Sequence, residues 1–155
     1  MISVSSAWRT AMENSTAFYP TATIRLADES SITLGREDFT VENNSFSDSA
    51  GVSGLPLGVA MCRTIQIELV NDDARYADVS FLGAVIDLDL NFVVNGSVEA
   101  FAVGSFTVTE PETYGTTVIL SAQDDMYKAD KPYTTALTFP ASAQQVIMEI
   151  ATNCG

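Results

Sequence analysis

The sequence contains no histidine, and this absence excludes several common kinds of active site. Ser-His-Asp and Cys-His nucleophile systems need an imidazole as general base, and the usual histidine-bearing zinc sites need it as a ligand. Cysteine is scarce too, because Cys62 and Cys154 lie far apart and are too few for a four-cysteine site. Two free thiols in a reducing compartment are the expected state, with a disulfide between them as the alternative.

Basic residues are also few, since seven Lys and Arg stand against 20 Asp and Glu and give a formal net charge of −13. Proteins that bind nucleic acid present a basic patch, which this composition does not supply, so no specific nucleic-acid binding is predicted. The acidic residues are dispersed along the chain. A surface of this kind serves solubility, and it also repels the phosphates of any nucleic acid nearby.

Long apolar runs are missing, and the longest, such as residues 92–94, span only a few positions. A transmembrane helix needs about 20 apolar residues, and residues 1–15 lack the basic and apolar parts of a secretory signal. No membrane association is therefore predicted. No GxxxxGK[ST], GxGxxG or calcium-loop pattern occurs, so no catalytic, cofactor-binding or metal-ligating residue is assigned and no cofactor is expected.

The sequence does contain apolar–polar alternation, which predicts a mainly β fold of the α+β class in one domain, residues 1–155. The Asn95-Gly96 turn predicts one long hairpin over residues 84–110, with a bulge or bend near Gly104. Residues 42–56 are rich in Ser, Asn and Gly and predict a mobile loop. The other expected strands cover residues 21–28, 31–35, 61–70 and 116–123.

Apolar spacing predicts a helix near each end of the chain. The first helix covers residues 4–12 and begins at a capping serine, and Trp8 is expected to pack it onto the sheet. The second helix lies within residues 139–155. A capping box formed by Ser142 and Gln145 marks its start.

Carboxylate pairs are the remaining sign of catalysis. Asp87 and Asp89 lie on one side of a strand with Asn91, about 7 Å apart along it, and a glycosidase could use such a pair. The strict alternation around them favours the solvated face of a sheet. Adjacent Asp124 and Asp125 precede a short helical turn, whose start negative charge stabilises. Three tyrosines are a weaker candidate for a ligand platform and are more often core or interface residues: Tyr76, Tyr127 and Tyr133.

From Leu55 onward the sequence carries an ordered series of short motifs: LPLG before a strand, FLGA, GSFTV, DDM, PY and a helix that runs from FP to CG. This series resembles the N-terminal region of phage and prophage tail proteins of the baseplate-hub type. The resemblance covers most of the chain, from about Thr21 to the end. The matching positions are Gly58, Phe81, Gly83, Ala84, Gly104, Phe106, Val108, Asp125, Met126, Pro132, Tyr133, Pro140, Cys154 and Gly155.

The resemblance implies a tail-tube-like antiparallel β-barrel or sandwich with a flanking helix. Such hubs carry two related barrels per chain, and three chains form a ring around the DNA channel, so this chain would be the N-terminal fragment of a longer protein. It implies a structural, non-enzymatic virion component that self-associates, contacts other tail and baseplate proteins, and is assembled in the bacterial host cytoplasm. Some relatives carry a wall-degrading domain further along the chain.

Two other functions stay open on the residues alone. A β-sandwich module for ligand binding or adhesion would present an exposed aromatic platform. A carboxylate-dependent hydrolase would hold a buried carboxylate pair with perturbed pKa values in a cleft.

Overall fold

The computed structural model describes residues 5–13, 18–48, 62–94, 96–129, 132 and 134–154. These residues form seven strands, two α-helices and two short 3₁₀-helices. In chain order the elements are α1 (Ser6–Glu13), β1 (Phe18–Arg25), β2 (Ser31–Leu34), η1 (Arg36–Asp38), β3 (Ser45–Asp48), β4 (Arg63–Val70), β5 (Val85–Val94), β6 (Ser97–Tyr114), β7 (Thr117–Gln123), η2 (Asp125–Ala129) and α2 (Ala143–Cys154).

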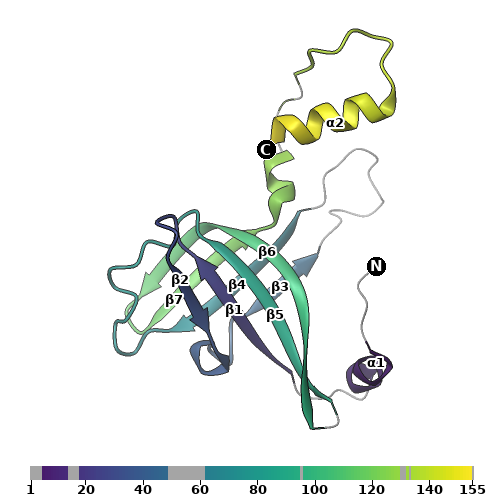
Figure 1. Cartoon of the computed structure of the whole chain (residues 1–155). Coiled ribbons are helices and arrows are strands. Elements are labelled where there is room, and N and C mark those ends of the chain that lie inside the picture. Colours follow the sequence, from purple (N-terminus) through teal and green to yellow (C-terminus); the bar gives the residue numbers. More distant parts are fainter. Residues whose placement is uncertain are drawn as a thin grey trace.

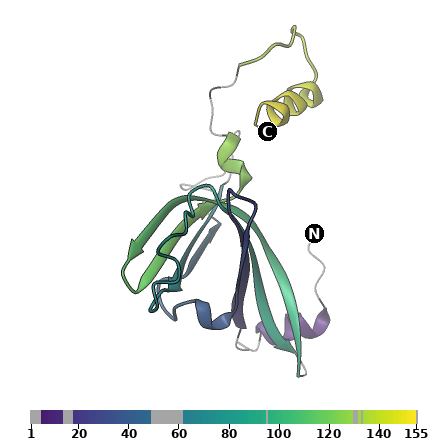
Figure 2. The ribbon, with the colours of Figure 1, turned by 60° about the vertical axis from the view of Figure 1, so that its left-hand side comes forward.

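All strands join one antiparallel sheet in the order β2-β1-β5-β6-β7-β4-β3. The sheet curls into a trough, so that its two halves lie opposite each other (Figures 1 and 2). Strands β2 and β3 end the sheet and do not pair with each other, so the described strands do not close into a barrel. The predicted mainly β, antiparallel fold is confirmed, and the sheet is open.

Alternate side chains of the strands fill the trough. Ile65, Ile67 and Leu69 of β4 are buried, as their alternation with polar residues predicted. The segment after η1 crosses the trough, because Phe39 forms an isolated antiparallel bridge with Leu69. Among the described residues the most buried large side chains are Phe106, Ile24, Leu34, Leu69, Ile86, Leu120, Val108 and Val118.

Strands β5 and β6 form the predicted long hairpin, and the predicted bulge is confirmed. Gly104 pairs with Leu88 and Ala102 pairs with Asp89, which leaves Val103 as the extra residue. One prediction for β5 is wrong: Asn91, expected on the solvated face, is only 7% exposed. Its side-chain amide donates to Thr21 Oγ1 at 2.8 Å, so pairing with β1 covers it.

Residues 45–48 of the segment predicted as a loop, 42–56, form strand β3 instead. Each residue of β3 pairs with β4, in the register that places Phe46 beside Ile65. The loop prediction for residues 49–56 lies outside the described residues.

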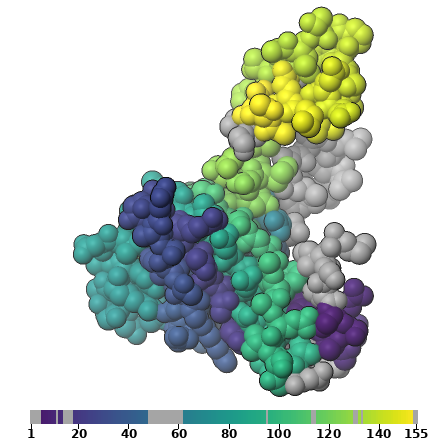
Figure 3. Space-filling model, in the orientation of Figure 1, coloured from purple at the N-terminus to yellow at the C-terminus, as the bar shows by residue number. Residues whose placement is uncertain are grey.

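Both predicted helices form. The hydroxyl of Ser5 caps α1 by accepting from Trp8 N at 3.0 Å, and the indole of Trp8 packs on Phe92 and Phe101 of the hairpin. The predicted capping box of α2 is present, since Gln145 Oε1 accepts from Ser142 N at 2.8 Å. Helix α2 stands away from the sheet, beyond η2 (Figures 1 and 3). Within the described part of the chain, neither helix has the length and apolar character to cross a membrane.

Candidate functional site

The carboxylate pair of the long hairpin lies on the outer face of the sheet. Asp87 Oδ2 is 3.1 Å from Arg25 Nη2 on β1, and Ser105 Oγ also donates to Asp87. The side chains of Arg25 and Asp87 are 57% and 41% exposed, so this ion pair is worth no more than about 0.5 kcal/mol. Asp89 is partly exposed and lies opposite Thr21. The pair occupies a solvated sheet face, which is the arrangement that alternation favoured.

The other candidate residues do not gather into one site. Asp125 is exposed and pairs with Lys128 at 2.8 Å, whereas Asp124 is buried in a different set of contacts. Tyr76 is a core residue whose ring packs on Phe81. Tyr127 is partly buried in η2, and Tyr133 lies outside the described residues. Over the described ranges no cluster of three or more His, Cys, Asp or Glu side chains is placed to hold a metal ion.

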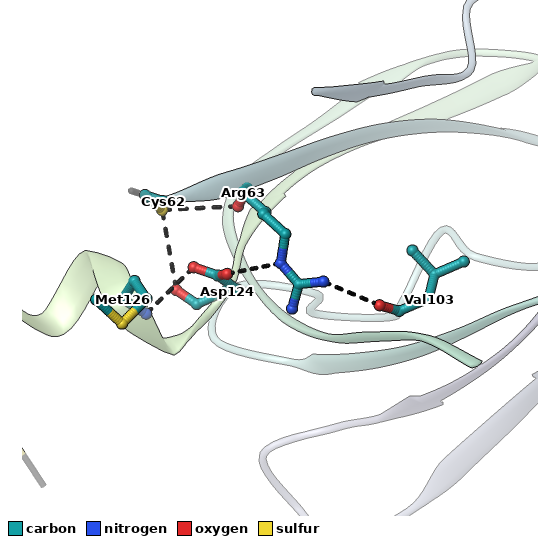
Figure 4. Close-up of polar contacts among 5 residues, drawn as sticks. All are labelled: Cys62, Arg63, Val103, Asp124 and Met126. Carbon is teal, nitrogen blue, oxygen red and sulfur yellow. Dashed lines mark hydrogen bonds and ion pairs between the residues drawn. The ribbon is translucent and has the colours of Figure 1, made fainter. Parts of the chain in front are cut away.

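Asp124 belongs to a partly buried polar junction that joins three strands of the sheet to η2 (Figure 4). Arg63, the first residue of β4, directs Nε to Asp124 Oδ2 at 3.0 Å and Nη1 to the Val103 carbonyl oxygen at 3.1 Å. The bulge makes that carbonyl available, and the guanidinium lies over the Phe106 ring. The second oxygen of Asp124 accepts from Met126 N, at the start of η2. We call this set the Arg63–Asp124 junction.

The electrostatics of the junction follow from its burial. Burial by itself would raise the pKa of Asp124, but hydrogen bonds from Arg63, Cys62 and Met126 outweigh it and hold that pKa below its usual value. Burial, and next the nearby Asp124 carboxylate, raise the pKa of the Cys62 thiol. Cys62 is a free, partly buried cysteine and is therefore in its protonated, unreactive form at neutral pH. The side chain of Cys154 lies outside the described residues.

A second buried carboxylate, Glu68 of β4, holds the segment that crosses the trough. Its Oε2 accepts from Thr40 Oγ1 at 2.9 Å and from Asn43 Nδ2 at 3.0 Å. Its backbone N–H donates to Asn44 Oδ1, and its carbonyl accepts from Thr40 N. The hydrogen bonds from Asn43 and Thr40 lower the pKa of Glu68. The Glu68 carboxylate therefore has a structural role, since it accepts hydrogen bonds from the segment that follows η1.

A groove of about 510 Å³ opens between the N-terminal half of β1 and strand β3. We call it the strand groove. Ile67, Leu88 and Leu90 form its apolar floor, and the aromatic rings of Phe18 and Phe46 flank it. Among the described residues that line it there is no Asp or Glu, and neither Asp87 nor Asp89 contributes to it. The described lining therefore does not supply the buried carboxylate pair that a carboxylate-dependent hydrolase would need there.

Sequence reasoning did not single out Arg63 or Arg36, which organise the junction and the rim of the groove. A signal for Arg63 was present, because it shares the alternation of Ile65, Ile67 and Leu69 and so stands on the buried side of β4. A charge on a buried face must find a partner, which here is Asp124. Nothing in the sequence marks Arg36, since its neighbourhood is assembled by the fold.

No protein-family model matches the chain, and no curated protein matches it in sequence.

Proposed function

We propose that this chain is a structural module of a phage or prophage tail, of the baseplate-hub type, which assembles into a ring around the DNA channel. The proposal rests on the motif series described above and on one structural observation. The curled sheet is open, and strand β2 leaves one edge unpaired within the described residues. A wall built by continuing the sheet from one subunit to the next needs such an edge.

The geometry of β2 identifies the backbone groups that a neighbouring subunit would bind. Leu26 N donates to Ser30 O at the hairpin turn. Because alternate residues of an antiparallel strand face the same neighbour, Ile32 and Leu34 direct their backbone N–H and C=O groups toward β1. Ser31 and Thr33 consequently direct their N–H and C=O groups away from β1. A strand of a neighbouring subunit would pair with these two residues.

The acidic composition supports the same function. The net charge of −13 disfavours binding of DNA to the protein surface, because like charges repel within the roughly 10 Å over which salt leaves them unscreened. A ring lined by such a surface would let DNA pass without adhering. The outer face of the hairpin, with Asp87 and Asp89, is one surface that could face the channel.

The function is tested by the assembly state of the full chain and of a single edge variant. We expect negative-stain electron microscopy and native mass spectrometry to show closed rings with a central channel at high protein concentration. Thr33→Pro removes the outward N–H without removing a hydrogen bond to β1, so it should abolish the rings, whereas the matched Thr33→Val variant should keep them. Monomers at every concentration, or assembly that Thr33→Pro leaves unchanged, would contradict the proposal.

A ligand-binding module is the second candidate, and the strand groove favours it. Phe18 and Phe46 at the groove are 59% and 49% exposed, although their neighbours in the sheet are buried. Exposed aromatic rings beside an apolar floor are typical of a site that binds another molecule.

A further inference from the structure

Helix α1 lies against the β5–β6 hairpin near its turn, and few contacts hold it there (Figures 1 and 2). We propose that α1 is a displaceable cover, which leaves the hairpin while the sheet stays folded and so exposes an aromatic face. This inference goes beyond ring assembly, which concerns the edge of β2, and it is tested with variants that leave that edge unchanged.

The aromatic face beneath α1 consists of three phenylalanine rings on neighbouring strands. Phe18 of β1 pairs with Phe92 of β5, and their ring centroids are 5.5 Å apart. Phe101 of β6 lies on the same side of the sheet, since it pairs with Leu90, two residues before Phe92. Phe92 is 3% exposed although it is not part of the main core. The Trp8 ring, with its centroid 4.9 Å from that of Phe92, therefore supplies burial that the core does not.

Trp8 is the main contact between α1 and the hairpin. Among the described side chains of α1, only those of Ala7 and Trp8 are even partly buried. The second contact is polar and exposed, because Ser5 donates from N and Oγ to the two carboxylate oxygens of Glu99, at 3.1 and 2.7 Å. Met12, in the last turn, is 52% exposed and adds little burial. One aromatic side chain and one exposed set of hydrogen bonds thus account for most of the attachment.

Docking of the Trp8 ring leaves one polar group without a partner. The Nε1–H group of Trp8 is shielded from solvent and has no hydrogen-bond partner within the described part of the chain. A buried tryptophan normally finds such a partner, and an unmade hydrogen bond offsets part of the gain from burying the ring. Water can bind this group once α1 has left the hairpin. The unpaired donor therefore favours the released state.

The helix is also weak by itself. It has eight residues, and isolated helices shorter than about 12–15 residues are marginal in water. No acidic residue lies in its first turn and no basic residue in its last. Glu13 instead places a negative charge at its C-terminal end, where the helix dipole disfavours it. A segment with so little support opens at a lower free energy than the buried strands of the same protein.

Release of α1 changes the apolar surface of the chain. In the docked state Phe18 is 59% exposed, whereas Phe92 is buried and Phe101 is partly buried. Without α1 the three rings form one exposed patch, of the kind through which proteins associate. Docked α1 is therefore an autoinhibitory contact, because it keeps this patch small in the free chain.

Tryptophan fluorescence tests the release directly, because Trp8 is the only tryptophan of the chain. We expect its emission to shift to the red at a lower urea concentration than the circular dichroism of the sheet changes. Coincident transitions would indicate a single cooperative unit and would overturn the inference. Without urea, Trp8→Ala should increase binding of the apolar dye ANS and leave the circular dichroism of the sheet unchanged. Dye binding equal to that of the unaltered chain would also contradict a covering role.

Trypsin cleavage after Arg9, within α1, measures release without denaturant, because the protease needs an opened segment. We expect cleavage there to be about tenfold faster, or more, than cleavage after Arg63 at the start of β4. Equal rates at the two sites would mean that α1 opens only when the sheet unfolds. A rate after Arg9 as high as in a free peptide of residues 5–13 would mean that α1 does not cover the hairpin. Either result rejects the displaceable cover.

A matched pair of hairpin variants shows whether the contact with Glu99 controls release. Glu99→Gln removes the charge that Ser5 binds, so cleavage after Arg9 should become about two- to fivefold faster, the range of an exposed charged contact. Glu110→Gln makes the same change on the same strand but far from α1, and it should leave the rate unchanged. Equal effects of the two variants on cleavage after Arg9 would overturn the inference.

Discussion

The Arg63–Asp124 junction and the strand groove border the same trough but are built in opposite ways. At the junction the partly buried guanidinium of Arg63 binds a carboxylate and a carbonyl, and Phe106 beneath it is 1% exposed. At the groove Phe46, on the same inner face, is 49% exposed and belongs to an edge strand that pairs with β4 alone among the described strands. The same open sheet is therefore tightly packed at the junction and incompletely packed at the groove. Stability is expected to depend on the residues of the junction, and the exposed residues of the groove contribute less to it.

Truncating one phenylalanine in each region should give the largest difference in stability between the junction and the groove. Phe106→Ala should lower the free energy of unfolding by about 3–5 kcal/mol, because it empties a fully buried site. Phe46→Ala should lower it by about 1 kcal/mol, since half of that ring is already in water. Urea unfolding followed by circular dichroism measures both, and equal losses would show that the two regions are packed alike.

Gly104→Ala tests the backbone of the junction. Gly104 has φ +150°, and an added Cβ would lie 3.1 Å from Arg63 Nη2, so the variant should lose about 2–3 kcal/mol of stability. Gly35→Ala near η1 is the control. Its added Cβ would approach only the flexible carboxylate of Glu37, so the loss should be small in the same urea experiment. Similar stabilities of the two variants would mean that the bulge tolerates an ordinary residue.

Asp124→Asn removes the negative charge from the Arg63–Asp124 junction and keeps the shape of the side chain. We expect a loss of about 1–2 kcal/mol at neutral pH, where the charged hydrogen bond from Arg63 is intact. The pKa of Asp124 is lower in the folded than in the unfolded chain, so its contribution is complete above the unfolded pKa and disappears as pH falls through the folded one. Stability of variant and unaltered protein should therefore converge below about pH 4. A gap that stays constant down to acid pH would exclude this role of the carboxylate.

Much of the fold was predictable because it depends on local patterns. Alternation in β4 and β5 located the buried side of each strand, and Asn95-Gly96 located the hairpin turn. The exception at Asn91 has a physical cause, since its partner Thr21 comes from a strand about 70 residues away in sequence. A pattern within one strand does not contain that neighbour, so it assigned Asn91 to solvent.

The groove and the junction were not predicted because each is assembled by strand order. Phe18, Arg36 and Phe46 come together only when β1 and β3 border one gap, which no spacing in the sequence encodes. Arg63 was a partial exception, because its place in the apolar alternation of β4 required a buried partner. The pattern demanded such a partner without indicating that it would be Asp124.

Substituting Asp87 or Asp89 should have the smallest effect on stability, in contrast to substituting Asp124. Asp87→Asn and Asp89→Asn, singly or together, should change the free energy of unfolding by no more than about 0.5 kcal/mol, because both lie on the outer, partly exposed face and the one ion pair there is screened by water. The stability difference should also shrink as salt is added. Urea unfolding at low and high ionic strength measures this. A loss as large as that of Asp124→Asn would place these carboxylates among the residues that hold the sheet together.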